Sequence, residues 1–309
     1  MTVAAPRSID DYLKQLRAAL EGEDPALIQD ALYDAEEYLR AEIAAHPDKS
    51  EADVLELIAS TYGAPDEVAA AYRETEVKVK AALQPPKRPR SADPSALQKL
   101  FGVFLDPRAY ISLFFMLLTL ATGIVYFTFA VTGLALSAGL SILIIGLPFF
   151  LVFIGMTRVI SLGEGRLLEA ISGERMPRRP VHPGPPQGFV ARIVAMLKDP
   201  RTWTTLFYLL LMLPLGIVYF TAAVTGLATG MAMVAAPIFR LLEYIGWLPE
   251  WWFGGNDVQL NPQWLDNPAG YVVCAVLGVL ILTLLMHLAR GIGKLHARLA
   301  KALLVAPAT

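Results

Sequence analysis

Three long stretches without a charged side chain constrain this chain more than any other feature. They are residues 109–157, 202–239 and 267–289, with 49, 38 and 23 positions. A helix needs about 20 apolar residues to cross the hydrocarbon core of a bilayer. The first stretch is therefore long enough for two crossings, and each of the others for one. We predict four membrane-spanning helices, at about 109–131, 140–158, 203–226 and 269–289.

Two details of these spans depend on the sequence between them. A short uncharged turn near Leu136–Leu140 is expected to close the first pair of spans. Residues 227–247 continue beyond the predicted end of the third span as a mostly apolar segment, with Arg240 and Glu243 as its charged residues. The sequence leaves open whether they cross, re-enter or lie on the outer surface of the membrane.

The charges divide the chain into two parts. Residues 1–86 carry 8 basic and 18 acidic side chains, whereas the remainder carries 18 basic and 10 acidic ones. Such a division predicts separate modules. We expect an acidic helical domain at 8–83, a proline-rich basic linker at 84–96, and membrane units at 97–180 and 181–303.

The acidic domain has clear helix start and stop signals. Ser8 and Ser50 are candidate N-caps, Asp24-Pro25 can restart the chain, and Gly22 and Gly63 can stop helices. Together these signals predict four helices. The predicted fold class is all-α: a four-helix N-terminal domain followed by four membrane spans.

An internal repeat is the most specific pattern in the sequence. Asp106-Pro107-Arg108 returns as Asp199-Pro200-Arg201, and the thirteen residues 123–135 return at 216–228 with twelve identities, at a constant offset of 93. Arg158 and Arg290 match at an offset of 132. We interpret the pattern as a duplication, in which the second unit carries an insertion of roughly 39 residues within 238–276.

The basic residues predict the topology. Five lie in 87–108, eight in 158–201 and four in 290–301, whereas the insertion has only Arg240. Because loops on the cytoplasmic side are enriched in Lys and Arg, both termini are expected inside the cell. The two units then have the same orientation and form parallel repeats.

Catalytic chemistry has no support in the sequence. No nucleophile–base set, phosphate loop or metal-ligand spacing is present, and the histidines are scattered. No carboxylate falls within the four predicted spans. We therefore expect no catalytic residue, no metal site and no cofactor, and no direct binding of nucleic acid.

Four acidic residues in the N-terminal domain form one candidate binding surface, which we call the acidic cluster: Asp34, Glu36, Glu37 and Glu42. One interpretation is a solvated helix face. The other is a docking surface for a basic partner.

Small and aromatic residues in the repeats form a second candidate set: Tyr126, Gly133, Tyr219, Gly226 and Gly230. Small residues four positions apart let helices approach closely, so packing seams between the two repeats are expected. The alternative is a flexible turn that opens when a ligand binds.

Tryptophans in and beside the insertion form a third set: Trp247, Trp251, Trp252 and Trp264. Tryptophan at this density marks a membrane–water interface, so contact with lipids of the outer leaflet is expected. A site for a lipid-like ligand is the alternative.

Two resemblances to known families follow from these motifs. Tyr62-Gly63-Ala64-Pro65-Asp66-Glu67, after Glu36-Glu37-Tyr38-Leu39, resembles the HAAS family of small helical domains. The repeated Asp-Pro-Arg start and the Gly-Ile-Val-Tyr-Phe-Thr core resemble the putative sensor family of bacterial, largely actinobacterial, membrane proteins. The first resemblance implies association with PadR-like transcription regulators, and the second implies a sensor in the bacterial cell membrane.

The sequence therefore predicts a non-enzymatic membrane sensor that relays an envelope or lipophilic signal to a cytoplasmic regulator, with a homo-oligomer left open. A transporter or permease accessory component is the main alternative, and a passive membrane scaffold is the other.

Overall fold

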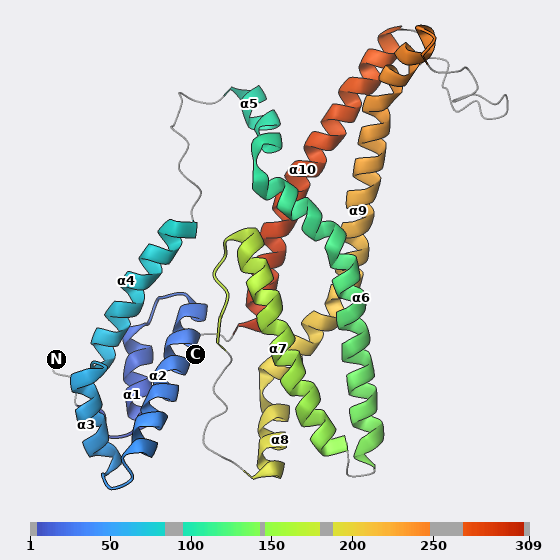
Figure 1. Ribbon diagram of the computed structural model, residues 1–309. Coiled ribbons are helices and arrows are strands. Elements are labelled where there is room, and N and C mark those ends of the chain that lie inside the picture. The colour runs from blue at the N-terminus through green and yellow to red at the C-terminus, as the bar shows by residue number, and fades with distance from the viewer. Residues whose placement is uncertain (1–4, 84–94, 143–145, 180–187, 248–267, 306–309) are drawn as a thin grey trace. The chain divides into compact units, whose positions relative to one another are not determined.

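A computed structural model describes residues 5–83, 95–142, 146–179, 188–247 and 268–305 (Figure 1). Every regular element in these ranges is a helix, which confirms the predicted all-α class. The chain forms two compact units. The first unit comprises 1–90, 128–210 and 296–309, and the second comprises 91–127 and 211–295.

The N-terminal part of the first unit contains four helices: α1 (Ile9–Ala19), α2 (Pro25–Ala45), α3 (Glu51–Thr61) and α4 (Pro65–Leu83). Their ends follow the predicted signals. The hydroxyls of Ser8 and Ser50 accept hydrogen bonds from the third residue beyond them, and the Asp24 carboxylate caps α2. Gly22 and Gly63 adopt φ values of 86° and 108°, which a residue with a Cβ rarely adopts.

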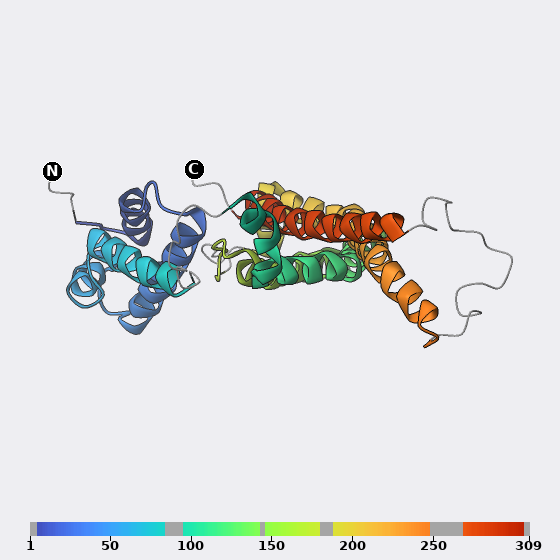
Figure 2. The ribbon, with the colours of Figure 1, turned by 90° about the horizontal axis from the view of Figure 1, so that it is seen from above.

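Helix α1 packs on both α2 and α4 in this bundle (Figure 2). Its core is apolar and fully enclosed, with Tyr12, Leu16 and Leu39 inaccessible to solvent. The hydroxyl of Tyr12 donates to the carbonyl of Gly63 over 2.8 Å, so the buried phenol ties α1 to the turn before α4. Each helix is thus stabilised by its neighbours rather than by its own propensity.

Among the described residues, four helices are long and apolar enough to cross a membrane, as predicted: α6 (Pro107–Ser141), α7 (Gly146–Ser172), α9 (Pro200–Tyr244) and α10 (Pro268–Leu304). Short helices precede two of them. Helix α5 (Ala96–Phe101) and the 3₁₀ turn η1 (Gly102–Leu105) lead into α6, and α8 (Phe189–Lys198) leads into α9.

Two expectations about these helices need correction or completion. The predicted turn at Leu136–Leu140 is wrong, because α6 continues as a helix to Ser141. In an apolar run, the backbone satisfies its polar groups at least cost by staying helical until polar surroundings begin. The same reason accounts for residues 227–244, which continue α9 without a break.

In the second unit, α6 and α9 approach each other through two glycines. A Cβ on Gly123 would lie 2.5 Å from the Met212 carbonyl oxygen, and one on Gly216 would lie 2.6 Å from that of Thr119. Thr119 and Met212 are themselves 93 positions apart, as the two glycines are. The contact between α6 and α9 is therefore reciprocal.

Candidate functional site

Three polar side chains meet in the interior of the first unit. The Tyr208 hydroxyl on α9 donates to Glu164 Oε1 on α7 over 3.0 Å, and the Tyr208 hydroxyl oxygen also lies 3.0 Å from His296 Nε2 on α10. All three residues are buried. Because the phenol has one proton to donate, the hydrogen bond with the imidazole requires Nε2–H of His296 as its donor. The three groups join three long helices through one hydrogen-bonded chain.

The sequence did not predict this set of hydrogen bonds. No carboxylate lies in the predicted second span, which ends at residue 158, whereas α7 continues to Ser172 and includes Glu164. His296 has no metal-ligand or catalytic spacing to the other histidines in the sequence. One signal was available: Glu164 and His296 are 132 positions apart, which is the offset that relates the ends of the repeats.

In addition to the hydrogen bonds of Tyr208, the first unit contains an ion pair at the start of α9. Arg158 on α7 contacts Asp199 over 3.2 Å, and the other carboxylate oxygen of Asp199 accepts the backbone N–H of Arg201 over 3.0 Å. The indole of Trp203, in the first turn of α9, donates to the carbonyl of Leu197, near the end of α8, over 2.9 Å. Asp199 thus caps α9 and connects it to α7.

The second unit contains the same set of bonds at the matching positions. Arg290 on α10 contacts Asp106 over 3.3 Å, and Asp106 accepts the backbone N–H of Arg108 over 3.0 Å. The Tyr110 hydroxyl donates to the carbonyl of Phe104 over 3.0 Å. Each Asp-Pro-Arg sequence is therefore paired with the trailing arginine of the other repeat.

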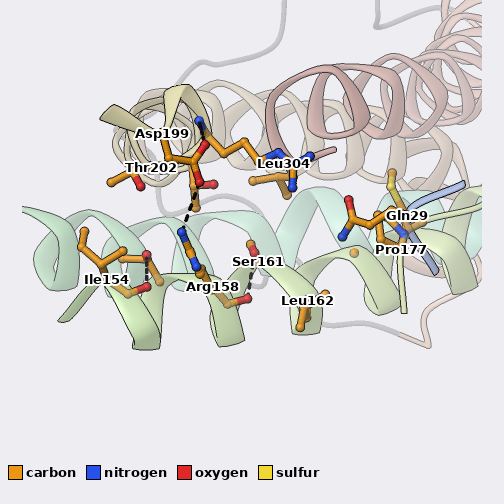
Figure 3. Close-up of a pocket in the computed structure, with 14 residues that line it drawn as sticks. Gln29, Ile154, Arg158, Ser161, Leu162, Pro177, Asp199, Thr202 and Leu304 are labelled. Carbon is orange, nitrogen blue, oxygen red and sulfur yellow. Dashed lines mark hydrogen bonds and ion pairs between the residues drawn. The ribbon is translucent and has the colours of Figure 1, made fainter. Parts of the chain in front are cut away.

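A small cavity opens next to the Asp199 ion pair, with a volume of about 50 Å³ (Figure 3). Its wall is formed by α7, the start of α9, the end of α10, α2 and the segment after α7. The lining combines hydroxyls, two arginines and apolar side chains: Gln29, Ile154, Thr157, Arg158, Ser161, Leu162, Gly165, Met176, Pro177, Asp199, Arg201, Thr202, Thr205 and Leu304.

The first unit also contains the contact between the N-terminal helices and the membrane helices. Its centre is Asp30 on α2, whose side chain is 6% exposed. One oxygen of Asp30 accepts the backbone N–H groups of Arg178 and Arg179 over 2.8 and 2.9 Å, and the other contacts the Arg175 guanidinium over 3.0 Å. Arg175 also pairs with buried Glu76 of α4. We call residues 175–179 the basic segment.

Burial dominates the electrostatics of this contact. It raises the pKa of Asp30 above its ordinary value, while the two backbone N–H groups and Arg175 act in the opposite direction. A buried carboxylate under such a penalty depends strongly on its partners. Lys301 at the end of α10 adds a peripheral ion pair with Asp24, at 2.6 Å.

The acidic cluster is only partly brought together here. Asp34 accepts the Tyr72 hydroxyl over 2.9 Å and pairs with Arg179 over 2.9 Å. Glu36 instead pairs with Arg40 on its own helix, Glu42 lies 3.8 Å from His46, and Glu37 is exposed. Asp30 and Glu76, which lie beside the basic segment, were not among the four residues predicted from the sequence.

The predicted glycine seams lie within each helix pair and not between the repeats. Gly133 on α6 faces the Phe153 ring on α7, and Gly226 on α9 faces Leu285 on α10. Gly230, one turn further, meets Leu282. The close contact between repeats is instead formed by Gly123 and Gly216, which lie about three turns from Gly133 and Gly226 towards the start of each helix.

The remaining candidates are the two tyrosines of the repeats and the tryptophans. Tyr219 is buried in the apolar core of the second unit, and Tyr126 is half-buried. Trp247 is 80% exposed at the end of the described part of the third span, as an interfacial side chain would be. Trp251, Trp252 and Trp264 lie outside the described residues.

Comparison with known proteins identifies a family for the membrane helices. No curated protein and no solved structure matches the chain. One family model does match, the family described as "Putative sensor", over residues 115–304. That range covers more than half of the chain and includes the Tyr208–Glu164–His296 chain, the Asp199 ion pair and the basic segment. This protein is a membrane protein of the putative sensor family.

Proposed function

We propose that the protein senses a signal in or near the membrane with its paired helices and transmits it to the N-terminal domain through Asp30 and the basic segment. The observation that carries this proposal is the set of three hydrogen bonds that Asp30 receives from residues 175–179. They connect α2 to the residues that directly follow a membrane helix.

The path from the membrane helices to Asp30 is short. Helix α7 ends at Ser172, and Gly173 follows with a φ of 73°. The basic segment begins two residues later. Met176 and Pro177 of that segment are buried and line the cavity beside Arg158. A shift of α7 relative to α9 would therefore move the residues that hold α2.

The contact is also suited to reversible release. A cavity of about 270 Å³ lies among the charged groups of α2, α4 and the basic segment, so the interface is not closely packed. Charged and polar groups provide most of its direct bonds. Such contacts depend on geometry more steeply than apolar packing does, because a buried charge that loses its partner is costly.

The partner that fits this arrangement is a basic surface of a cytoplasmic protein. Release of the basic segment would uncover Asp30, Asp34 and Glu76 on the same side of the domain, and these acids would attract a cationic partner. The resemblance to HAAS domains suggests a PadR-like transcription regulator. This assignment requires the N-terminal domain to face the cytoplasm, as the distribution of basic residues predicts.

The proposal is tested by capture of such a regulator with the full-length protein in lipid nanodiscs. The variant Arg175→Ala weakens the internal contact and is expected to retain more regulator than the natural sequence. Arg178→Ala is the comparison variant and should have a smaller effect, because the Arg178 guanidinium bonds Glu169 of α7 over 2.9 Å and interacts with Asp30 and Glu76 only at longer range, while the backbone N–H that Asp30 accepts is retained. Capture of no PadR-like regulator by any of the three proteins would contradict the relay.

A passive scaffold makes a different prediction. If the membrane helices only anchor the N-terminal domain, an unrelated membrane anchor in place of residues 97–303 would preserve regulation of the target genes. The relay predicts that regulation then becomes independent of the signal.

A further inference from the structure

We propose that the cavity beside Arg158 and Asp199 binds a phosphate group with one negative charge, carried by a phospholipid headgroup or free in solution. The inference deepens the proposed function, since it names the ligand chemistry that the first unit would detect. Binding itself does not depend on the relay and is measured separately from it.

The charges around the cavity leave one cation to be balanced. Arg158 and Arg201 line it, and Asp199 contributes one carboxylate, which contacts Arg158 over 3.2 Å and caps α9. The guanidinium of Arg201 is the second positive charge in the lining of the cavity. The set therefore has one net positive charge, which matches a phosphodiester, whereas a doubly charged anion would be left partly unbalanced.

Buried polar atoms in the wall lack partners. Arg201 Nη1 and Thr202 Oγ1 are inaccessible to solvent and have no hydrogen-bond partner among the described residues. Thr202 as a whole is only 3% exposed. Both atoms can donate a hydrogen bond, and buried donors without acceptors are costly. A phosphate oxygen is an acceptor that would satisfy both.

The position along the chain favours a lipid as the source of the phosphate. Arg158 is the first charge after the uncharged residues 109–157, and Arg201 is the last charge before the uncharged residues 202–239. Both therefore mark the edge of the hydrocarbon region, where phospholipid phosphates lie. Ile154, Leu162 and Leu304 provide apolar contacts for the glycerol and the first acyl carbons.

The matching positions of the second unit explain why one site is expected and not two. Ala109 stands in place of Thr202, Ala289 in place of Thr157, and Gly293 in place of Ser161. Ala109 and Ala289 are fully buried in an apolar core. Arg108, the counterpart of Arg201, is exposed.

The test titrates full-length protein in detergent micelles and counts bound ligands by native mass spectrometry. Three probes are compared: short-chain phosphatidylglycerol, inorganic phosphate, and short-chain diacylglycerol, which lacks the phosphate. Arg201→Gln is expected to weaken phosphate-dependent binding at least tenfold, and Thr202→Ala, which copies Ala109, by several fold. Arg108→Gln is the matched control and should change nothing.

Each outcome decides the question. Binding of phosphatidylglycerol but not diacylglycerol, with this dependence on Arg201 and Thr202, supports a lipid site. Equally tight binding of inorganic phosphate with the same dependence supports the phosphate site and assigns it to the free ion. The proposal is overturned if no phosphate probe binds, if neither variant weakens binding, or if Arg108→Gln weakens it as much as Arg201→Gln does.

Discussion

The Asp199 region of the first unit and the Asp106 region of the second have the same bonds but different surroundings. Both have an aspartate that caps a long helix, an arginine from the other repeat, and an aromatic residue that donates to a backbone carbonyl. Around Asp106 the matching positions are Ala109, Ala289 and Gly293, and one hydroxyl is kept as the buried Ser112. Around Asp199 they are threonines and a serine, which line a cavity.

The comparison indicates which positions of a repeated structure can change while the bonds that hold its helices together are retained. The capped, ion-paired helix start holds two helices together, and both regions retain it. The positions that differ between the two regions, such as Thr202 and Ala109, lie next to this helix start and take no part in the shared bonds. The Asp199 region is also continuous with the N-terminal domain, through Gln29, Met176 and the bonds to Asp30.

The largest expected effect is a difference in docking between variants of Arg175 and Lys301, two basic residues that contact the N-terminal domain. Arg175→Ala removes the guanidinium that contacts both buried acids, Asp30 and Glu76, so we expect it to weaken docking by about 3–5 kcal/mol. Lys301→Ala removes a partly exposed pair and should cost about 1 kcal/mol or less. Hydrogen–deuterium exchange of the Arg178 and Arg179 amides, which donate to Asp30, measures docking in nanodiscs. Equal exchange rates for the two variants would contradict this ranking.

The second-largest effect is expected from the buried hydrogen bonds that join Tyr208, Glu164 and His296 in the first unit. Tyr208→Phe copies Phe115, its counterpart in the other repeat, and removes one oxygen that serves both Glu164 and His296. We expect a loss of about 3 kcal/mol in the free energy of unfolding, because two buried polar groups lose a partner. Thermal unfolding in detergent micelles measures the loss. An unchanged midpoint would show that the hydrogen-bonded chain adds no stability.

The contact between the repeats tests their equivalence. Gly123→Ala and Gly216→Ala each place a Cβ against a backbone carbonyl that cannot move aside easily, so each should cost about 2 kcal/mol. The two effects should be similar, since the contacts are reciprocal. Gly155→Ala is the control, because nothing lies within 4 Å of its Cβ position. Strongly unequal losses, measured by the same unfolding assay, would argue against a twofold relation.

The smallest effect comes from exchanging residues between the regions. Ala109→Thr places a hydroxyl in an enclosed apolar core and should cost about 1 kcal/mol. Thr202→Ala should be close to neutral for folding, because its hydroxyl has no partner among the described residues. The comparison fails if Thr202→Ala is the more destabilising of the two in thermal unfolding.

Much of the fold could be predicted from the sequence because its signals are local. The N-caps at Ser8 and Ser50, the left-handed glycines and the uncharged runs each act within a few residues, and the helices begin and end close to them. Helix ends inside apolar runs were less predictable. There no polar residue marks the boundary, so α6 and α9 extend beyond their expected ends.

The site depended on contacts between distant residues. Tyr208, Glu164 and His296 are far apart in sequence and meet only because three helices pack together. Asp30 and Arg175 are separated by 145 positions. No spacing rule connects such pairs. The repeat offsets were the one long-range signal available, and they relate Arg158 to Arg290 and Glu164 to His296.

The most direct test of the account compares Arg158→Ala with Arg290→Ala by hydrogen–deuterium exchange of full-length protein in nanodiscs. Both variants remove the arginine from an equivalent ion pair. If the first unit transmits changes at the Asp199 region to the N-terminal domain, Arg158→Ala will accelerate amide exchange in α2 around Asp30, and Arg290→Ala will not. Equal exchange of α2 in both variants would contradict the account.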